Sequence, residues 1–188
     1  GLTLTDPRPL NREKLRFLTA GLTTAVQGFP ALPYVANEVE SIQQLYKSDQ
    51  LLNNAFQTSR LEQELREGKY GGLHIATHGK FSTDVNDSYL LTFDGKLTMQ
   101  TLDQLIGLFR FRQEPLELLT LSACQTGVGD DRAALGLAGV ALKAGARSAL
   151  ATLWFINDEA SATLISEFYR QLRDPSVSKA VALQRAQQ

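Results

Sequence analysis

The sequence has little of several things that would assign it to a large functional class. Its 188 residues include a single cysteine, Cys124, so no disulfide can form within the chain, and we expect a reducing, cytoplasmic setting. Apolar stretches are short and interrupted by polar residues, which excludes a membrane-spanning helix and argues against a membrane partner. Residues 1–9 are polar and carry two prolines, so we expect no signal peptide there.

Neither sign of charge is in excess, since 19 Lys and Arg balance 20 Asp and Glu for a formal net charge of −1. No basic run interleaved with aromatic residues occurs, which argues against a nucleic-acid partner. His74 and His78 are four residues apart, but no Glu follows His74 as a zinc-peptidase helix requires, so we interpret His74 as a packed neighbour. We therefore expect neither a metal ion nor a cofactor.

What the sequence does contain is typical of one α/β domain. Hydrophobic residues make up 43% of the chain, and its length suffices for a single substantial core. We expect one domain over residues 1–188, with residues 1–12 as an extended lead-in. Strands are predicted at residues 14–20, 49–52, 73–77, 116–122 and 148–153, and a hairpin at 89–99. Helices are predicted at residues 36–47, 59–68, 101–109, 133–144, 158–173 and 178–188.

Two capping boxes support this reading, Ser59 with Glu62 and Thr101 with Gln104, each expected to begin a helix. Strands that alternate with helices indicate a mainly parallel sheet with helices on both faces. Such sheets carry their functional groups beyond the carboxyl ends of the strands.

Two reactive side chains follow two of the predicted strands. His78 comes directly after residues 73–77, and Cys124 comes shortly after residues 116–122. If adjacent parallel strands carry them, the imidazole can act as general base toward the thiol and then protonate a leaving amine. A lone cysteine is also commonly an inert, buried apolar residue, so these residues alone leave both interpretations open.

Three segments together resemble the CHAT family of caspase-like peptidase domains, which are related to separase. They are LHIATHG (residues 73–79), LLTLSACQTGVGD (118–130) and KAGARSALATLWFINDEAS (143–161). The resemblance implies a caspase-like three-layer sandwich and a catalytic dyad of His78 and Cys124. It also implies an oxyanion hole made by the backbone N–H groups of Gly79 and Cys124, and a full-length protein with tetratricopeptide repeats or another regulatory domain.

Trp154 and Asp158 resemble a Trp-x-x-x-Asp stretch of separases, in which the Asp holds the arginine before the scissile bond. The resemblance implies that Asp158, beside Trp154, selects a substrate Arg or Lys, because guanidinium pairs bidentately with carboxylate. Asn157, Asp158 and Glu159 are also typical of a helix N-terminus, and this alternative stays open.

The sequence departs from the family in two places. Residues 131–134 read Asp-Arg-Ala-Ala where many relatives carry a Gly-Glu pair, and the chain stops at Gln188 where many relatives continue into a final strand, so we expect a truncated C-terminal end. We expect a cysteine endopeptidase that acts on a protein or peptide substrate through a covalent acyl-enzyme. The alternatives are a non-catalytic interaction module of this fold and a peptidase that stays silent until a partner reshapes its site.

Overall fold

The computed structural model describes residues 2–4, 15–82, 84–112, 114–125, 139–152 and 158–188. The strands are β1 (Leu2–Leu4), β2 (Arg16–Gly21), β3 (Lys47–Leu52), β4 (Gly72–Lys80), β5 (Tyr89–Leu91), β6 (Lys96–Thr98), β7 (Leu118–Gln125) and β8 (Ser148–Thr152). The helices are α1 (Val35–Leu45), α2 (Thr58–Glu67), α3 (Met99–Gly107), α5 (Asp158–Gln171) and α6 (Lys179–Ala186), with 3₁₀ turns η2 (Asn53–Ala55) and η3 (Val85–Asp87). Residues 139–144 are also helical.

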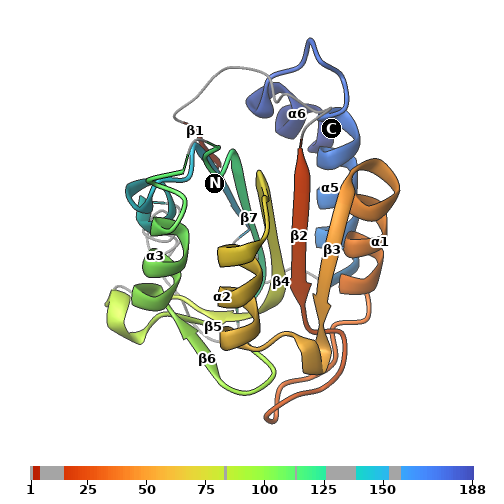
Figure 1. Ribbon diagram of the computed structural model, residues 1–188. Helices are drawn as coiled ribbons and strands as arrows, with labels where there is room; N and C mark the ends of the chain where they lie inside the picture. Colours follow the sequence, from red (N-terminus) through yellow and green to blue (C-terminus); the bar gives the residue numbers. More distant parts are fainter. Residues whose placement is uncertain (1, 5–14, 83, 113, 126–138, 153–157) are drawn as a thin grey trace.

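The strands form one mixed sheet in the order β1-β8-β7-β4-β2-β3, and the β5–β6 hairpin joins it at the end of β4 (Figure 1). The central pairs β2–β3, β2–β4, β4–β7 and β7–β8 are parallel. Pairs β1–β8, β4–β5 and β5–β6 are antiparallel. The predicted mainly parallel sheet is therefore confirmed, and part of the expected lead-in is a sheet strand, β1.

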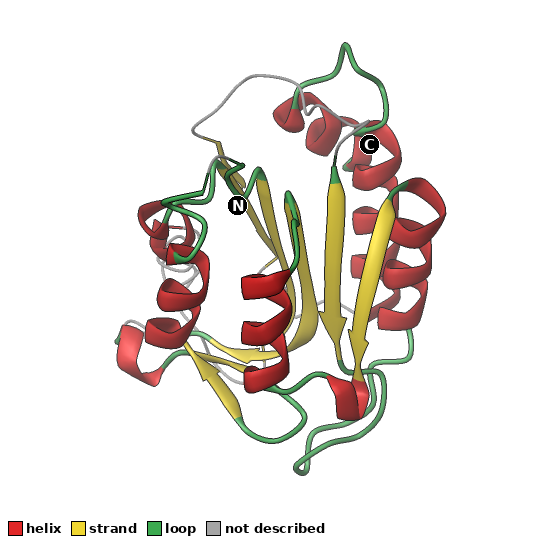
Figure 2. Cartoon of the chain, viewed as in Figure 1, coloured by secondary structure: helices red, strands yellow, loops and turns green. Residues whose placement is uncertain are grey.

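Helices cover both faces of this sheet, as Figure 2 shows. α2 and α3 pack on one face through Leu61, Leu65, Leu102 and Leu105, in a cluster that includes alternate residues of β2, β4, β7 and β8. α1, α5 and α6 pack on the other face against the intervening strand residues. This is the three-layer α/β arrangement expected from the alternation of strands and helices.

Each strand shows the alternation that two covered faces require. On β7, Leu119 and Leu121 belong to the α2/α3 side of the core, whereas Leu118 belongs to the α1/α5 side. On β4, Leu73 and Ile75 face α2 and α3, while Ala76 packs with Val35 and Val39 of α1. Even-numbered positions of β4 and β7 therefore lie on the α1/α5 face.

The predicted helix caps are wrong by a few residues. Ser59 lies inside α2, whose N-cap residue Gln57 makes no side-chain cap hydrogen bond, and Thr101 lies inside α3. The cap of α3 is Thr98, whose hydroxyl oxygen accepts from the Thr101 backbone N–H at 3.2 Å. Thr58 is already the first helical residue of α2, and Thr98 caps α3. Both helices therefore begin before the predicted cap residues.

The other predicted elements are confirmed within a few residues, and the predicted helix at 133–144 is described only over 139–144. β4 and β7 are longer than predicted: they continue to Lys80 and Gln125, so His78 and Cys124 lie within the strands and not after them. None of the helices in the described ranges combines the length and apolar character that a membrane crossing demands.

Candidate active site

His78 and Cys124 occupy matching positions on neighbouring strands. β4 and β7 pair in parallel over residues 72–79 and 118–125, and in this register His78 lies opposite Cys124. Both positions are near the carboxyl ends of their strands, at the edge of the sheet where a parallel fold carries its functional groups. Residues separated by 46 positions in sequence are thus level with one another across one strand pair.

His78 is buried, with 3% of the residue's surface exposed. Its hydrogen bond to the backbone determines which ring nitrogen carries the proton. Nε2 lies 2.8 Å from the carbonyl oxygen of Pro30, which can only accept, so Nε2 carries the hydrogen and donates it. The other ring nitrogen, Nδ1, is buried and has no hydrogen-bond partner among the described residues. In the neutral ring this Nδ1 bears the lone pair, which is the arrangement a general base needs.

The loop between β2 and α1 holds this histidine from one side. The ring of Phe29 lies against the imidazole, with the ring centroids 5.1 Å apart. Val26 and Phe29 pair across a tight turn in which Gln27 and Gly28 have φ angles of 51° and 82°. The Gln27 side chain donates from Nε2 to the carbonyl oxygen of Thr92 at 3.0 Å, which ties the turn to the end of β5.

Gly79 directly follows the histidine at a position with no room for a side chain. A Cβ there would lie 2.8 Å from Cζ of Phe81 and 3.2 Å from Cβ of Ala123. Gly79 pairs with both Gln125 of β7 and Leu90 of β5, so the backbone at this point joins three strands. Glycine lets these strands converge beside His78.

Sequence reasoning missed a buried polar network on the α1/α5 face, two to four residues before the dyad. His74 is completely buried, as expected of a packed residue, and its Nε2 lies 3.0 Å from Oε2 of Glu38 on α1. Ser122 of β7 donates to Oε1 of the same carboxylate at 3.0 Å. Only the polar residue Glu38 on the apolar side of α1 hints at this in the sequence.

The network continues to α5. Nδ1 of His74 lies 3.1 Å from the hydroxyl of Tyr169, which lies 2.8 Å from Oγ1 of Thr120. Burial raises the pKa of Tyr169 far above its ordinary value, so this side chain remains a neutral hydroxyl that can donate. The Tyr46 hydroxyl donates to the Tyr169 carbonyl oxygen at 3.0 Å and joins α1 to α5.

Two predicted substrate-pocket residues are described only in part. Trp154 lies outside the described residues, and Asp158 is described only as the first residue of α5. The side chain of Cys124 is likewise outside them. The substrate-pocket prediction for Trp154 and Asp158 thus stays a prediction.

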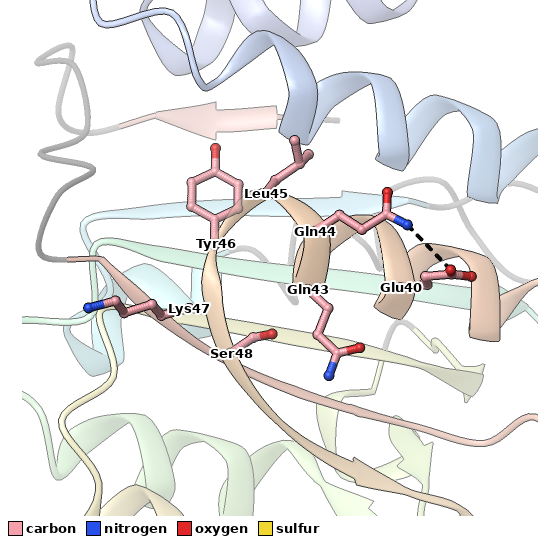
Figure 3. A pocket seen from close by; sticks show the side chains of 7 residues that line it. All are labelled: Glu40, Gln43, Gln44, Leu45, Tyr46, Lys47 and Ser48. Carbon is pink, nitrogen blue, oxygen red and sulfur yellow. Dashed lines mark hydrogen bonds between the residues drawn. The ribbon is translucent and has the colours of Figure 1, made fainter.

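An open hollow on the surface belongs to a different part of the molecule. It is lined by the C-terminal residues of α1 and the first residues of β3, including Glu40, Gln44, Tyr46 and Lys47 (Figure 3). The side chain of Gln44 donates to Glu40 at 3.3 Å beside it. Because Lys47 begins β3, this hollow is at the amino-terminal edge of the parallel strands, opposite His78.

The sequence model of the CHAT domain matches residues 4–188 of this chain. No curated protein matches the chain significantly. Among solved structures, the protein GSU0716 from Geobacter sulfurreducens is similar at 16% sequence identity and a TM-score of 0.43. The match covers 61% of this chain and 52% of that protein, so the chain spans about half of its length.

Proposed function

Because this chain belongs to the CHAT domain family, we propose that it is a caspase-like cysteine endopeptidase with His78 and Cys124 as its dyad. The observation that supports this most strongly is the register of β4 and β7, which pairs the two residues directly. Residues paired in a parallel ladder lie on the same face of a sheet, so an imidazole and a thiol at these positions are expected to be neighbours.

The proposed chemistry begins at Nδ1 of His78. Its lone pair takes the thiol proton, because Nε2–H is already committed to the Pro30 carbonyl oxygen. The thiolate attacks the peptide carbonyl carbon, and the resulting imidazolium returns a proton to the leaving amine, which leaves an acyl-enzyme. Water then hydrolyses the thioester with His78 again as base. The Pro30 carbonyl keeps the imidazole in the required tautomer and stabilises its cationic form.

The backbone N–H groups of Gly79 and Cys124 are proposed to stabilise the tetrahedral oxyanion. They follow from the family resemblance and not from the space beside Gly79, which the side chains of Phe81 and Ala123 fill. The chemistry of this proposal uses protein groups alone and requires no cofactor.

The substrate is proposed to be a protein or peptide, in the cytoplasm, cut after a basic residue. Asp158 at the start of α5 would supply the carboxylate for a guanidinium, with Trp154 beside it. A tetratricopeptide-repeat or other regulatory domain would control access to the site.

Alkylation of Cys124 by iodoacetamide tests the dyad without any knowledge of the substrate. The chain has a single cysteine, so every labelled thiol is Cys124, and Cys124→Ala gives the background. We expect His78→Ala to slow labelling at pH 7 roughly thirtyfold, since a free thiol with its pKa near 8.5 is only a few per cent thiolate there. Equal rates for wild type and His78→Ala, in folded proteins, would reject the peptidase and favour a non-catalytic module.

Substrate selection is tested separately with peptides that differ only at the residue before the cut. Wild type is expected to cleave the Arg peptide fastest, then Lys, and hardly the uncharged Gln peptide. Asp158→Asn should lower kcat/KM for Arg by at least about a hundredfold, as loss of a charge-assisted bidentate pair does, and leave the alkylation rate unchanged. A wild-type preference for Gln over Arg removes the role of Asp158.

A further inference from the structure

A single buried carboxylate connects the two strands that carry the proposed dyad. Oε2 of Glu38 lies 3.0 Å from Nε2 of His74 on β4, and Oε1 accepts from the Ser122 hydroxyl of β7 at 3.0 Å. His74 precedes His78 by four residues and Ser122 precedes Cys124 by two, all at even-numbered positions of the same strand pair. Glu38, 1% exposed, therefore spans β4 and β7 just below the candidate site.

This carboxylate stands where an apolar side chain would be easier to accommodate. Its neighbours on the buried side of α1 are Val35, Val39 and Ile42, which pack on the sheet without any polar contact. Taking a carboxylate out of water has a large desolvation penalty, and apolar replacements of buried charged groups are often as stable or more stable. Stability alone is thus a poor explanation for Glu38.

Both carboxylate oxygens of Glu38 have a hydrogen-bond partner. Nε2 of His74 lies 3.0 Å from Oε2 and Ser122 donates its hydroxyl to Oε1, while Nδ1 of His74 donates to the Tyr169 oxygen. The Tyr169 hydroxyl in turn donates to Oγ1 of Thr120, 2.8 Å away. Each described member of this network has a partner, so the Glu38 carboxylate holds the side chains of His74 and Ser122 in one arrangement.

We propose that Glu38 is a positioning residue for the dyad, a bridge across β4 and β7 that fixes the imidazole of His78 relative to the thiol of Cys124. This proposal rests on the proposed peptidase function. The backbone ladder sets which residues face one another and the distance between the strands. The bridge restrains how the two strands shift and twist against each other on the α1/α5 face. A displacement of about 1 Å between reacting groups can lower a rate about a hundredfold.

Two variants separate positioning from stability. Glu38→Gln keeps the bridge, because its amide oxygen accepts from Ser122 and its NH₂ donates to Nε2 of His74, while Nδ1–H of His74 still donates to the Tyr169 oxygen. The triple variant Glu38→Leu/His74→Leu/Ser122→Ala removes the bridge and every group that would be left unpaired, while Tyr169 retains Thr120. Glu40→Gln, on the exposed side of α1, is the matched control for loss of charge.

The readouts are the unfolding midpoint, the Cys124 alkylation rate and kcat on the best peptide found. We expect the triple variant to unfold no earlier than wild type and yet lose at least about tenfold in alkylation rate and kcat, with KM little changed. Glu38→Gln should stay within about threefold of wild type, as should Glu40→Gln.

The proposal is overturned if the triple variant keeps wild-type rates, or if Glu38→Gln loses as much as the triple variant, which would indicate the charge and not the bridge. His78→Ala, measured in parallel, distinguishes this failure from that of the proposed function. If His78→Ala labels as fast as wild type, the dyad is wrong and the bridge proposal falls with it. If His78→Ala is slow and the triple variant is not, only the bridge proposal is wrong.

Discussion

The carbonyl oxygen of Pro30 can only accept a hydrogen bond, so His78 must donate to it from Nε2–H. That one contact decides which nitrogen is basic, because the lone pair is then on Nδ1. The sequence identifies His78 as a candidate from its place near a strand end, but Pro30 is 48 residues away in the chain and nothing near either residue predicts their contact. Tautomer control is therefore visible only in the folded chain.

Gly79→Ala tests how closely the strands beside His78 must converge. The added methyl would lie 2.8 Å from the Phe81 ring, so β4 or Phe81 must move. We expect overpacking to lower the free energy of unfolding by about 1–3 kcal/mol. We also expect the displacement of His78 to lower the Cys124 alkylation rate by about tenfold or more. Chemical denaturation and alkylation measure the two effects.

Gly95→Ala is the control, because a Cβ at Gly95 meets nothing within 4 Å. It should leave the alkylation rate unchanged. A Gly79→Ala variant as reactive as wild type would contradict the tight geometry described for this position.

Tyr70 makes stability depend on pH at the alkaline end. Burial, followed by the hydrogen bond to Asp49, raises the pKa of Tyr70 above its ordinary value of 10.0. A raised folded-state pKa stabilises the fold fully below the unfolded value, and this contribution is lost as pH rises above about 10, by up to about 1.4 kcal/mol for each pH unit.

Urea unfolding between pH 8 and 11 checks this expectation. The stability of Tyr70→Phe, which has no phenol to ionise, should decline less steeply than that of wild type above pH 10. Parallel declines would show that Tyr70 ionises as readily in the folded state as in the unfolded one.

At the scale of elements, the central strands are easy to predict and their ends are not. The apolar, partly β-branched run at residues 73–77 indicates a buried strand. His78, Gly79 and Lys80 have no such pattern, and they extend β4 because β7 and β5 supply hydrogen-bonding partners from distant parts of the chain. Local sequence carries no information on those partners.

The same limit applies to Glu38. An amphipathic pattern predicts α1 and its apolar side, but a carboxylate on that side conflicts with the pattern unless its partners are known. His74 and Ser122 are 36 and 84 residues away. Only the folded chain brings these partners to the carboxylate.

The turn at Val26–Phe29 is expected to help position His78. Gln27 adopts a left-handed φ of 51°, which strains a non-glycine residue, and its side chain ties the turn to Thr92. Gln27→Gly relieves the strain but loses the tie, so we expect the unfolding free energy to change by less than about 1 kcal/mol. The alkylation rate should fall about three- to tenfold, because Phe29 and Pro30 hold His78 less firmly.

Gln43→Ala, an exposed glutamine on α1, is the matched control and should change neither quantity. If Gln27→Gly reacts at the wild-type rate, the turn does not position His78 and only the Pro30 contact remains for that role.

In the whole molecule, the two faces of the sheet, each covered by its own layer of helices, differ in the polarity of the side chains that lie near the candidate site. β4 and β7 present mainly apolar side chains to α2 and α3, among them Leu73, Ile75 and Leu121. The face toward α1 and α5 carries His74, Ser122 and Thr120, and position 78 follows on the same side. The alternation of strands and helices predicts the layers, but it does not say which layer carries the polar groups.

A crystal structure of the chain, free of inhibitor, measures the distance between the two reacting atoms of the proposed dyad. We predict Sγ of Cys124 within about 4 Å of Nδ1 of His78, close enough for proton transfer directly or after a small movement on substrate binding. A sulfur enclosed in apolar side chains on the α2/α3 face, away from the imidazole, would contradict the account.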